Sequence, residues 1–227
     1  MISPLVNSLA ILVGSLIGLL LKKGIPERLT ESVMKALGLC VIFIGIRGFF
    51  YGENVLVLIV SMVVGTLIGE GFDLDSKLTK FGAWLEGKFR SKNGKKPKIA
   101  EGFITATLLF CVGAMAIVGS LQSGLTGNHE MIFTKSLLDF VAAIIFTSTL
   151  GIGVALSAGS VLIYQGLIVT LSTWFAPLLT YSVIYEMTSV GSLIILALGL
   201  NIIGVTKIKV MNLVPAIFLP ILLMLFM

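Results

Sequence analysis

Long apolar runs separated by short polar segments constrain this chain more than any other feature. Eight runs are predicted to be membrane-spanning helices, at about 3–21, 33–50, 54–71, 101–121, 133–155, 159–179, 187–205 and 209–227. About 20 helical residues cross the roughly 30 Å of hydrocarbon in a bilayer. Only 12% of the residues are charged, against about 25% in soluble domains, which argues against a soluble fold. The sequence therefore predicts an all-α integral membrane protein, a glycine-rich bundle of about eight transmembrane helices, some of them broken.

The distribution of Lys and Arg predicts the orientation of these spans. With the N-terminus outside, fourteen of the sixteen basic residues fall in cytoplasmic segments, and only Arg47 and Lys135 do not. Basic residues in short loops set the orientation of membrane helices, so we predict that both termini lie outside and the basic loops are cytoplasmic. This asymmetry also explains the net charge of +5, so we expect the lipid bilayer as partner and no nucleic acid.

The whole chain, 1–227, is predicted to form a single transmembrane domain. Spans one to three lie in 1–72 and spans four to eight in 101–227, with a cytoplasmic segment at 73–100 between them. In that segment apolar residues recur every three or four positions, at Leu74, Leu78, Phe81, Leu85 and Phe89. This spacing predicts one amphipathic helix on the inner leaflet, followed by the polar linker 91–98. The alternative is a docking site for a partner.

Glycine is concentrated where close helix packing is expected. The stretch VGSLIG (13–18) is echoed by VGTLIG (64–69), which leaves open a parallel internal duplication. Small residues four apart let membrane helices approach closely, so both stretches predict either packing inside the bundle or a homo-oligomer seam through Gly-x-x-x-Gly faces. The glycines assigned to helix packing are Gly14, Gly18, Gly65, Gly69, Gly113, Gly119, Gly151 and Gly153.

Two of the predicted spans combine glycine with polar residues. They contain FCVGAMAIVGSLQSG (110–124) and TSTLGIGVALSAGS (147–160). Such helices bend or expose carbonyls only where they are buried in protein or line a wet cavity. Paired, interrupted helices point to the midplane site of a transporter, whereas the alternative is close packing of small residues.

Polar side chains inside the spans supply the candidate path. Asp139 lies within 133–155, and Lys135 is four residues earlier on the same helix face. A carboxylate at that depth is costly unless it is paired or hydrated, so it is either half of a structural ion pair or a cation or proton site. The amides have a second interpretation as hydrogen bonds between helices. The candidate substrate- or ion-path residues are Asp139, Gln122, Gln165, Asn201, Thr147 and Ser148.

Motifs for catalysis and cofactor binding are missing from the sequence. It contains no phosphate-binding Gly-Lys-Ser/Thr loop, no dinucleotide fingerprint and no His-Glu-x-x-His. His129 is the only histidine and has no metal-ligand spacing, and the two cysteines, Cys40 and Cys111, both lie in apolar runs. We therefore predict no enzyme activity, no metal site and no cofactor.

A resemblance to a known family is carried by four stretches: FCVGAMAIVGSLQSGLTGN (110–128), KSLLDF (135–140), TSTLGIGVALSA (147–158) and GLNIIGVTKIKVMNLVPA (199–216). They resemble the YdfK/YqgA-type multi-pass membrane proteins of bacteria, a domain-of-unknown-function family, and the likeness extends over essentially the whole chain. The resemblance implies a protein of the bacterial inner membrane. It supplies no substrate and no catalytic residues.

The function predicted from these features is transport of a small solute or ion, by a carrier or a channel. It is motivated by the coincidence of glycine-broken helices with polar residues at depth. The alternative is a non-transporting membrane scaffold or regulatory protein that uses the basic cytoplasmic loop.

Overall fold

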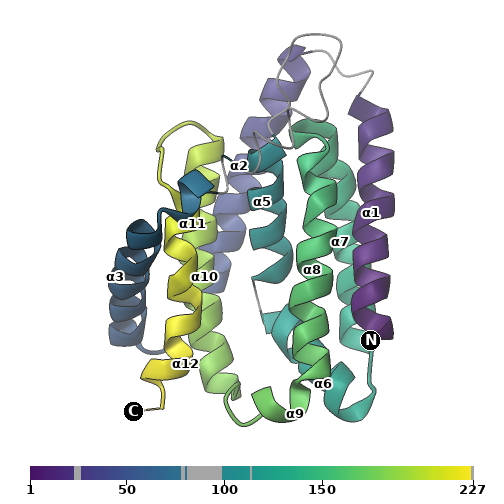
Figure 1. Ribbon diagram of the computed structural model, residues 1–227. Helices are drawn as coiled ribbons and strands as arrows, with labels where there is room; N and C mark the ends of the chain where they lie inside the picture. The colour runs from purple at the N-terminus through teal and green to yellow at the C-terminus, as the bar shows by residue number, and fades with distance from the viewer. Residues whose placement is uncertain (23–26, 78–79, 81–98, 113, 226–227) are drawn as a thin grey trace. The chain divides into compact units, whose positions relative to one another are not determined.

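The computed structural model describes residues 1–22, 27–77, 80, 99–112 and 114–225, and every regular element in these ranges is helical (Figure 1). Six helices are long and apolar enough to cross a membrane, and a seventh span results if one bent pair is counted as a single crossing. The all-α membrane fold is thus confirmed, with the count of about eight as an approximation. The six helices are α1 (Ile2–Lys22), α2 (Glu27–Phe49), α3 (Val55–Phe72), α7 (Glu130–Leu150), α8 (Gly153–Thr170) and α10 (Tyr181–Ile202).

The bent pair occupies the predicted fourth span, 101–121. It consists of α5 (Ile99–Cys111) and α6 (Ala114–Thr126), which are inclined to each other by 58°. The expectation of a broken helix is met in this glycine-containing stretch. Gly113, which falls between the two helices, lies outside the described residues.

The boundary between the predicted spans 133–155 and 159–179 was wrong. The chain turns at Gly151 and Ile152, whereas SAGS (157–160) lies inside α8. Gly151 has φ +84° and ψ −160°, a conformation that glycine adopts without the steric cost of a Cβ. The small residues of SAGS continue the helix, because Ala158 is a strong helix former and tertiary packing overrides the weaker helix propensity of Ser and Gly.

The last apolar run, predicted as a span at 209–227, is a succession of short helices. These are α11 (Val210–Leu213), the 3₁₀ helix η1 (Val214–Phe218) and α12 (Leu219–Leu223). Pro215 and Pro220 stand in the first turns of η1 and α12, where the missing backbone N–H interrupts the regular ladder. Two further boundaries also moved: α10 begins at Tyr181 instead of 187, and the short α9 (Ser172–Phe175) replaces the end of span 159–179.

The described residues form two compact units. Unit 1 contains α1, α5, α7, α8 and α6 from Met115 onward, and unit 2 contains α2 from Glu31 onward, α3, α10, α11, η1 and α12. The core of unit 1 includes Ile11, Ile132 and Val161, each 0% exposed. In unit 2, Leu58, Val190 and Ala216 pack together from α3, α10 and η1.

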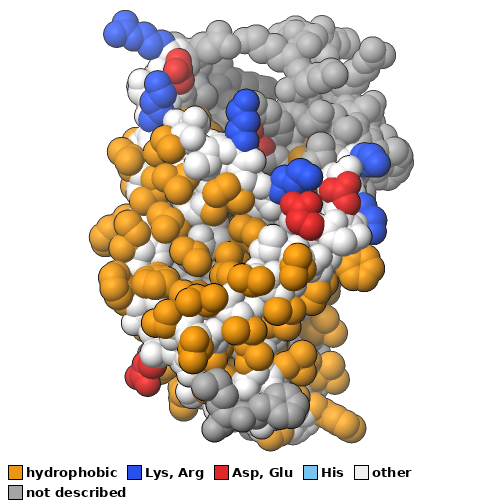
Figure 2. All heavy atoms as spheres, turned by 90° about the vertical axis from the view of Figure 1, so that its left-hand side faces the viewer, with side chains coloured by type: hydrophobic (Ala, Val, Ile, Leu, Met, Phe, Trp, Pro, Cys, Tyr) orange, Lys and Arg blue, Asp and Glu red, His pale blue; other side chains and the backbone are white. Residues whose placement is uncertain are grey.

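Large apolar side chains on α3 face outward. Val55, Leu56, Ile59, Val63 and Leu67 are between 51% and 69% exposed. Figure 2 views the side on which α3 lies and shows hydrophobic side chains over a broad band, with most of the charged ones gathered at one end. Contiguous apolar surface of this kind is rare on soluble proteins, whereas it suits contact with lipid.

The two echoed glycine stretches both pack inside the chain. A Cβ added to Gly14 or Gly18 would lie 2.5 Å from the carbonyl oxygen of Phe140 or Ile144 on α7. Added to Gly65 or Gly69, it would collide with the backbone of η1 or α11. α1 runs parallel to α7, whereas α3 runs antiparallel to η1 and α11. The similarity of VGSLIG and VGTLIG therefore does not extend to the helices against which they pack. It reflects a shared requirement for close backbone approach.

Some of the predicted features fall on residues outside the described ranges. The amphipathic helix expected in the 73–100 segment falls mainly on residues 78–79 and 81–98, and the linker 91–98 belongs to the same stretch. Both stay predictions from the sequence.

Candidate functional site

Lys135 and Asp139 form a buried ion pair on α7. Lys135 Nζ lies 2.8 Å from Asp139 Oδ1 and 2.6 Å from Oδ2, and each side chain is only 8% exposed. Their four-residue spacing places both on one face of the helix, where the long Lys side chain reaches along one turn to the carboxylate. The pairing that the sequence left as one of two alternatives is therefore present.

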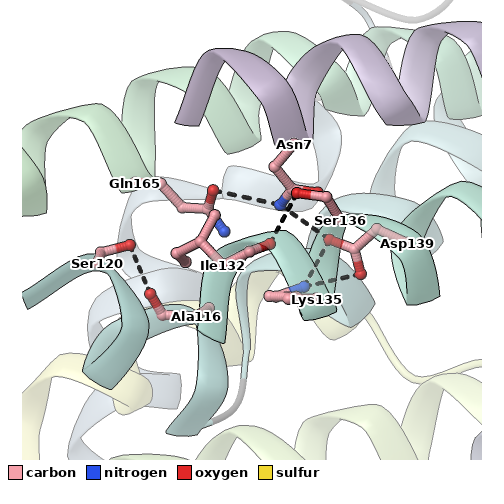
Figure 3. Close-up of polar contacts among 8 residues, drawn as sticks. All are labelled: Asn7, Ala116, Ser120, Ile132, Lys135, Ser136, Asp139 and Gln165. Carbon is pink, nitrogen blue, oxygen red and sulfur yellow. Dashed lines mark hydrogen bonds and ion pairs between the residues drawn. The ribbon is translucent and has the colours of Figure 1, made fainter. Parts of the chain in front are cut away.

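Amides from two neighbouring helices join this pair. Asn7 on α1 uses its Nδ2 group to donate to Asp139 Oδ2 at 3.0 Å and to Gln165 Oε1 on α8 at 3.2 Å. Figure 3 shows the four side chains converging between α1, α7 and α8. Asn7 and Gln165 are 0% exposed. The result is a closed polar network, which we call the Asp139 network: Asn7, Lys135, Asp139 and Gln165.

The network lies nearer one end of unit 1. Asn7 is five residues, or about 8 Å, from the start of α1, and Asp139 is nine residues, or about 14 Å, from the start of α7. Gln165 is five residues from the end of α8. That end adjoins the start of α1, since Thr170 Oγ1 lies 3.5 Å from Met1 Sδ. The three elements thus present their polar groups at similar depth.

Glycine spacing on α1 explains how Asn7 reaches its partners. Asn7, Gly14 and Gly18 recur at intervals of seven and four residues and therefore lie on one helix face. Gly14 and Gly18 rest against the backbone of α7. The short separation of the two helices brings a short Asn side chain within hydrogen-bond range of Asp139.

Two polar atoms of the Asp139 network have no hydrogen-bond partner among the described residues. They are Asn7 Oδ1, an acceptor, and Gln165 Nε2, a donor. Hydroxyls of the same unit share this property at greater depth, namely Ser15, Thr105, Thr107 and Thr147. A buried polar atom without a partner costs about 1–3 kcal/mol, so such atoms normally mark bound water or a ligand.

A second polar chain approaches the network from the near end of the unit. Ser3 Oγ lies 2.5 Å from Ser123 Oγ, and Ser123 Oγ lies 2.8 Å from Nδ1 of His129. Ser3 is 0% exposed and Ser123 5% exposed, whereas His129 is half-buried just before α7. The chain therefore connects an accessible imidazole to buried hydroxyls on α6 and α1. We call it the His129 chain.

The remaining path candidates from the sequence lie elsewhere. Gln122 is half-buried on α6, and Ser148 donates to the carbonyl of Ile145 within α7. Asn201 belongs to unit 2, where its side chain accepts from Ile208 N–H and Thr206 Oγ1 and donates to Ile208 O. The Asn201 side chain thus stabilises the turn that follows α10. Thr147 is fully buried beside Gly18. Of the six candidates, only Asp139 and Gln165 therefore belong to the Asp139 network among the described residues.

Sequence reasoning missed Glu186, and it considered Asn7 as an amide near a span end without counting it among the path candidates. Glu186 is 2% exposed on α10, and its Oε1 accepts from the backbone N–H groups of Glu53 and Asn54, each at 2.8 Å. The predicted span began at 187, which placed Glu186 outside the membrane. The sequence signal that could have identified Glu186 is that it is the single carboxylate among the apolar and hydroxyl residues of YSVIYEMTSVGS (181–192). Asn7 offered only an amide near a span end.

Removal of the Glu186 carboxylate is expected to destabilise unit 2. Glu186→Ala leaves two backbone N–H groups at the start of α3 without their acceptor, which is expected to cost about 1–3 kcal/mol. Glu186→Gln is the matched control, because its amide oxygen can still accept both bonds. Circular dichroism during SDS titration of the protein in detergent micelles measures the difference. Equal stability of the two variants would show that these bonds are unimportant.

Comparisons with known proteins give relatives over the full chain. The family described as "Protein of unknown function (DUF554)" matches residues 2–225. The "Uncharacterized membrane protein YdfK" of Bacillus subtilis (strain 168) is 32% identical over 224 residues, covering 97% of this chain and 94% of the relative. The "Uncharacterized protein YqgA" of Escherichia coli (strain K12) is 33% identical over 221 residues, covering 96% and 94%. No solved structure matches.

Proposed function

The chain belongs to the DUF554 family, as its resemblance to YdfK and YqgA predicted, and from that premise we propose that it transports a small solute or ion. The proposed path runs through unit 1, past the Asp139 network. The observation that carries the proposal is the buried ion pair of α7, joined by Asn7 and through it by Gln165, two amides that each retain a polar atom with no partner among the described residues.

A purely structural role explains this arrangement poorly. A charged side chain at the centre of a membrane helix costs about 2.5–3.5 kcal/mol by insertion measurements. A buried ion pair often adds no stability over apolar residues of similar volume, because desolvation offsets the attraction between the charges. Asn7 Oδ1 and Gln165 Nε2 would add a further cost if they stayed unpartnered. A small polar guest beside them would satisfy both atoms.

The buried hydroxyls suggest how such a guest would move further through unit 1. Ser15 on α1 and Thr147 on α7 lie further from the starts of their helices than the Asp139 network does. Thr105 on α5 comes from the opposite direction, since the start of α5 packs against Gly153 at the start of α8. These unpartnered hydroxyls offer hydrogen bonds along unit 1 without fixed charge.

The proposed setting is the bacterial inner membrane, with both termini outside and the basic loops cytoplasmic. The excess of Lys and Arg in the predicted cytoplasmic segments supports this orientation. It places the start of α1, and therefore the nearer end of the Asp139 network, toward the outside.

An enzymatic role is not part of the proposal. The contact between Ser123 Oγ and His129 Nδ1 has the spacing of a nucleophile and its base. Ser123 is only 5% exposed and shares its hydroxyl with Ser3, which does not favour attack on a substrate carbonyl. The pair is better suited to passing protons than to attacking a carbonyl.

Flux measurements on the full chain in liposomes test the transport proposal. The probes are gradients of H⁺, followed with a pH-sensitive dye, gradients of Na⁺, K⁺ and Cl⁻, followed with a potential-sensitive dye, and glycerol and urea, followed by osmotic swelling. We expect at least one probe to cross faster than in protein-free liposomes. Asp139→Asn is expected to lower that flux about tenfold or more, because it removes the charge that holds Lys135 in place.

The matched control for this experiment is Glu31→Gln. It makes the same change of acid to amide in a surface pair with Lys35, where the Glu side chain is 71% exposed. Unchanged flux in Asp139→Asn would remove Asp139 from the path. If no probe crosses, transport is the wrong function. The scaffold hypothesis would then be tested by asking whether a co-purifying partner is lost on deletion of residues 76–98.

A further inference from the structure

The His129 chain ends one helical turn from the Asp139 network. We propose that the ion used by this path is the proton, and that it enters through His129, Ser123 and Ser3 to reach Asp139. This inference rests on the proposed transport function and adds the identity of the ion and its route. All of its residues belong to unit 1.

The geometry of the His129 chain suits proton transfer. Its two contacts, 2.8 Å and 2.5 Å, are hydrogen-bond distances, and each serine hydroxyl both donates and accepts. The imidazole of His129 has a second nitrogen with which to exchange protons with solvent. Because Ser3 and Ser123 are almost fully buried, their hydroxyls can pass protons inward while larger ions are excluded.

One gap separates the two groups of residues. Ser3 and Asn7 are four residues apart on α1, on the same face and about 6 Å apart along the helix axis. Asn7 Oδ1 has no hydrogen-bond partner among the described residues, although it is buried. A water molecule that accepts from Ser3, donates one hydrogen to Asn7 Oδ1 and directs the other to the Asp139 carboxylate would close the gap and satisfy that atom.

Proton transfer along this route conserves the number of protons at each relay group. A proton binds His129 at Nε2 and another leaves Nδ1 for Ser123, whose own proton passes to Ser3. Ser3 gives its proton to the bridging water, and the water gives one to Asp139. Each relay member gains one proton and loses one, which leaves His129 as the tautomer protonated at Nε2, and only the carboxylate carries an added proton. Its neutralisation weakens the hold on Lys135, whose Nζ already lies 5.9 Å from the ring centroid of Phe110.

The surroundings of Asp139 favour a proton over a metal cation. Among the described residues, the groups that contact its carboxylate are donors, Lys135 Nζ and Asn7 Nδ2, whereas hard cations are held by several oxygen ligands. The further titratable side chain near the pair is that of Cys111 on α5. A metal ion would also have to pass Ser3 and Ser123, whose oxygens are already in contact. A proton needs only rearrangement of hydrogen bonds within that contact.

The route is tested by the rate at which Asp139 takes up a proton. The full chain in membranes is exposed to sudden acidification of the outer solution, and the infrared carbonyl band of a protonated carboxyl group is followed. The band of Asp139 is identified by its loss in Asp139→Asn. We expect Ser123→Ala and Ser3→Ala to slow its appearance about tenfold or more, with the final amplitude unchanged, because the relay is cut while the acceptor stays intact.

Two variants separate the relay from general structural damage. Ser123→Thr keeps a hydroxyl and is expected to keep the fast rate. Ser136→Ala removes a serine hydroxyl of α7 that donates to Ile132 O and lies outside the His129 chain, so its rate is expected to match the unmodified protein (Figure 3).

The inference is overturned if the band grows equally fast in Ser3→Ala and Ser123→Ala, or if Asp139 takes up no proton at all. Either result leaves the transport proposal standing when Asp139→Asn still lowers probe flux. Conversely, rapid protonation of Asp139 without flux of any probe would leave the proton route intact and remove the transport function.

Discussion

We expect that replacement of Lys135 with methionine lowers the free energy of unfolding by about 3–5 kcal/mol. The substitution keeps most of the side-chain volume and removes the ammonium group that contacts both oxygens of Asp139 at 2.8 Å and 2.6 Å. The carboxylate would stay buried with Asn7 as its remaining donor. An uncompensated buried charge, and not the loss of a favourable contact, is the reason for the large effect.

Replacement of the other member of the pair, Asp139, is expected to lower the free energy of unfolding by a similar amount. Asp139→Leu leaves the Lys135 ammonium without its carboxylate, on a side chain that is 8% exposed. The double variant, Lys135→Met with Asp139→Leu, is expected to recover most of the loss, because the site then contains no charge. The cycle therefore separates the penalty for an unpaired charge from the net value of the pair.

Unfolding by SDS in mixed micelles, followed by circular dichroism, gives the four free energies. A double variant as unstable as the sum of its parents would mean that the two charges do not interact, contrary to the structure. A double variant close to the unmodified protein in stability, yet without flux, would show that the ion pair serves transport and not folding.

The membrane character of this fold could be predicted because it depends on local sequence alone. Each membrane-length helix follows from an apolar run, and the broken helix from its glycines. Helix ends were harder to predict. Gly151 ends α7 through its backbone conformation, which cannot be predicted from a run of small residues. Pro215 stands where the last apolar run changes from α-helix to 3₁₀ helix, and the sequence alone does not show at which residue that change occurs.

The Asp139 network could be predicted only in part. The Lys135–Asp139 pair follows from a spacing of four residues on one helix. Asn7 is 132 residues from Asp139 in sequence, and the contact depends on how α1 packs against α7. A single sequence contains no information on that packing beyond the spacing of Gly14 and Gly18. Glu186 was missed for the same reason, since its role is to hold a loop that is distant in sequence.

The second large effect is expected at the glycines of α3. Gly65→Ala is expected to destabilise the protein by about 3 kcal/mol or more, because overpacking against a rigid backbone forces helices apart. A Cβ at this position would lie 2.3 Å from Ala216 Cα and 2.4 Å from Ala216 N, and neither atom can rotate away. Gly69→Ala is expected to behave alike, since its Cβ would meet the carbonyl oxygen of Asn212.

Gly71→Ala is the matched control on the same helix. No heavy atom of the described residues lies within 4 Å of a Cβ placed there, so the only expected effect is a gain of up to about 1 kcal/mol from helix propensity. Thermal unfolding in detergent compares the three variants. If Gly65→Ala were as stable as Gly71→Ala, α3 could not be packed on η1 as described. Its glycine face would then be free for a second copy of the chain, and the homo-oligomer seam that the motif also predicts would account for VGTLIG.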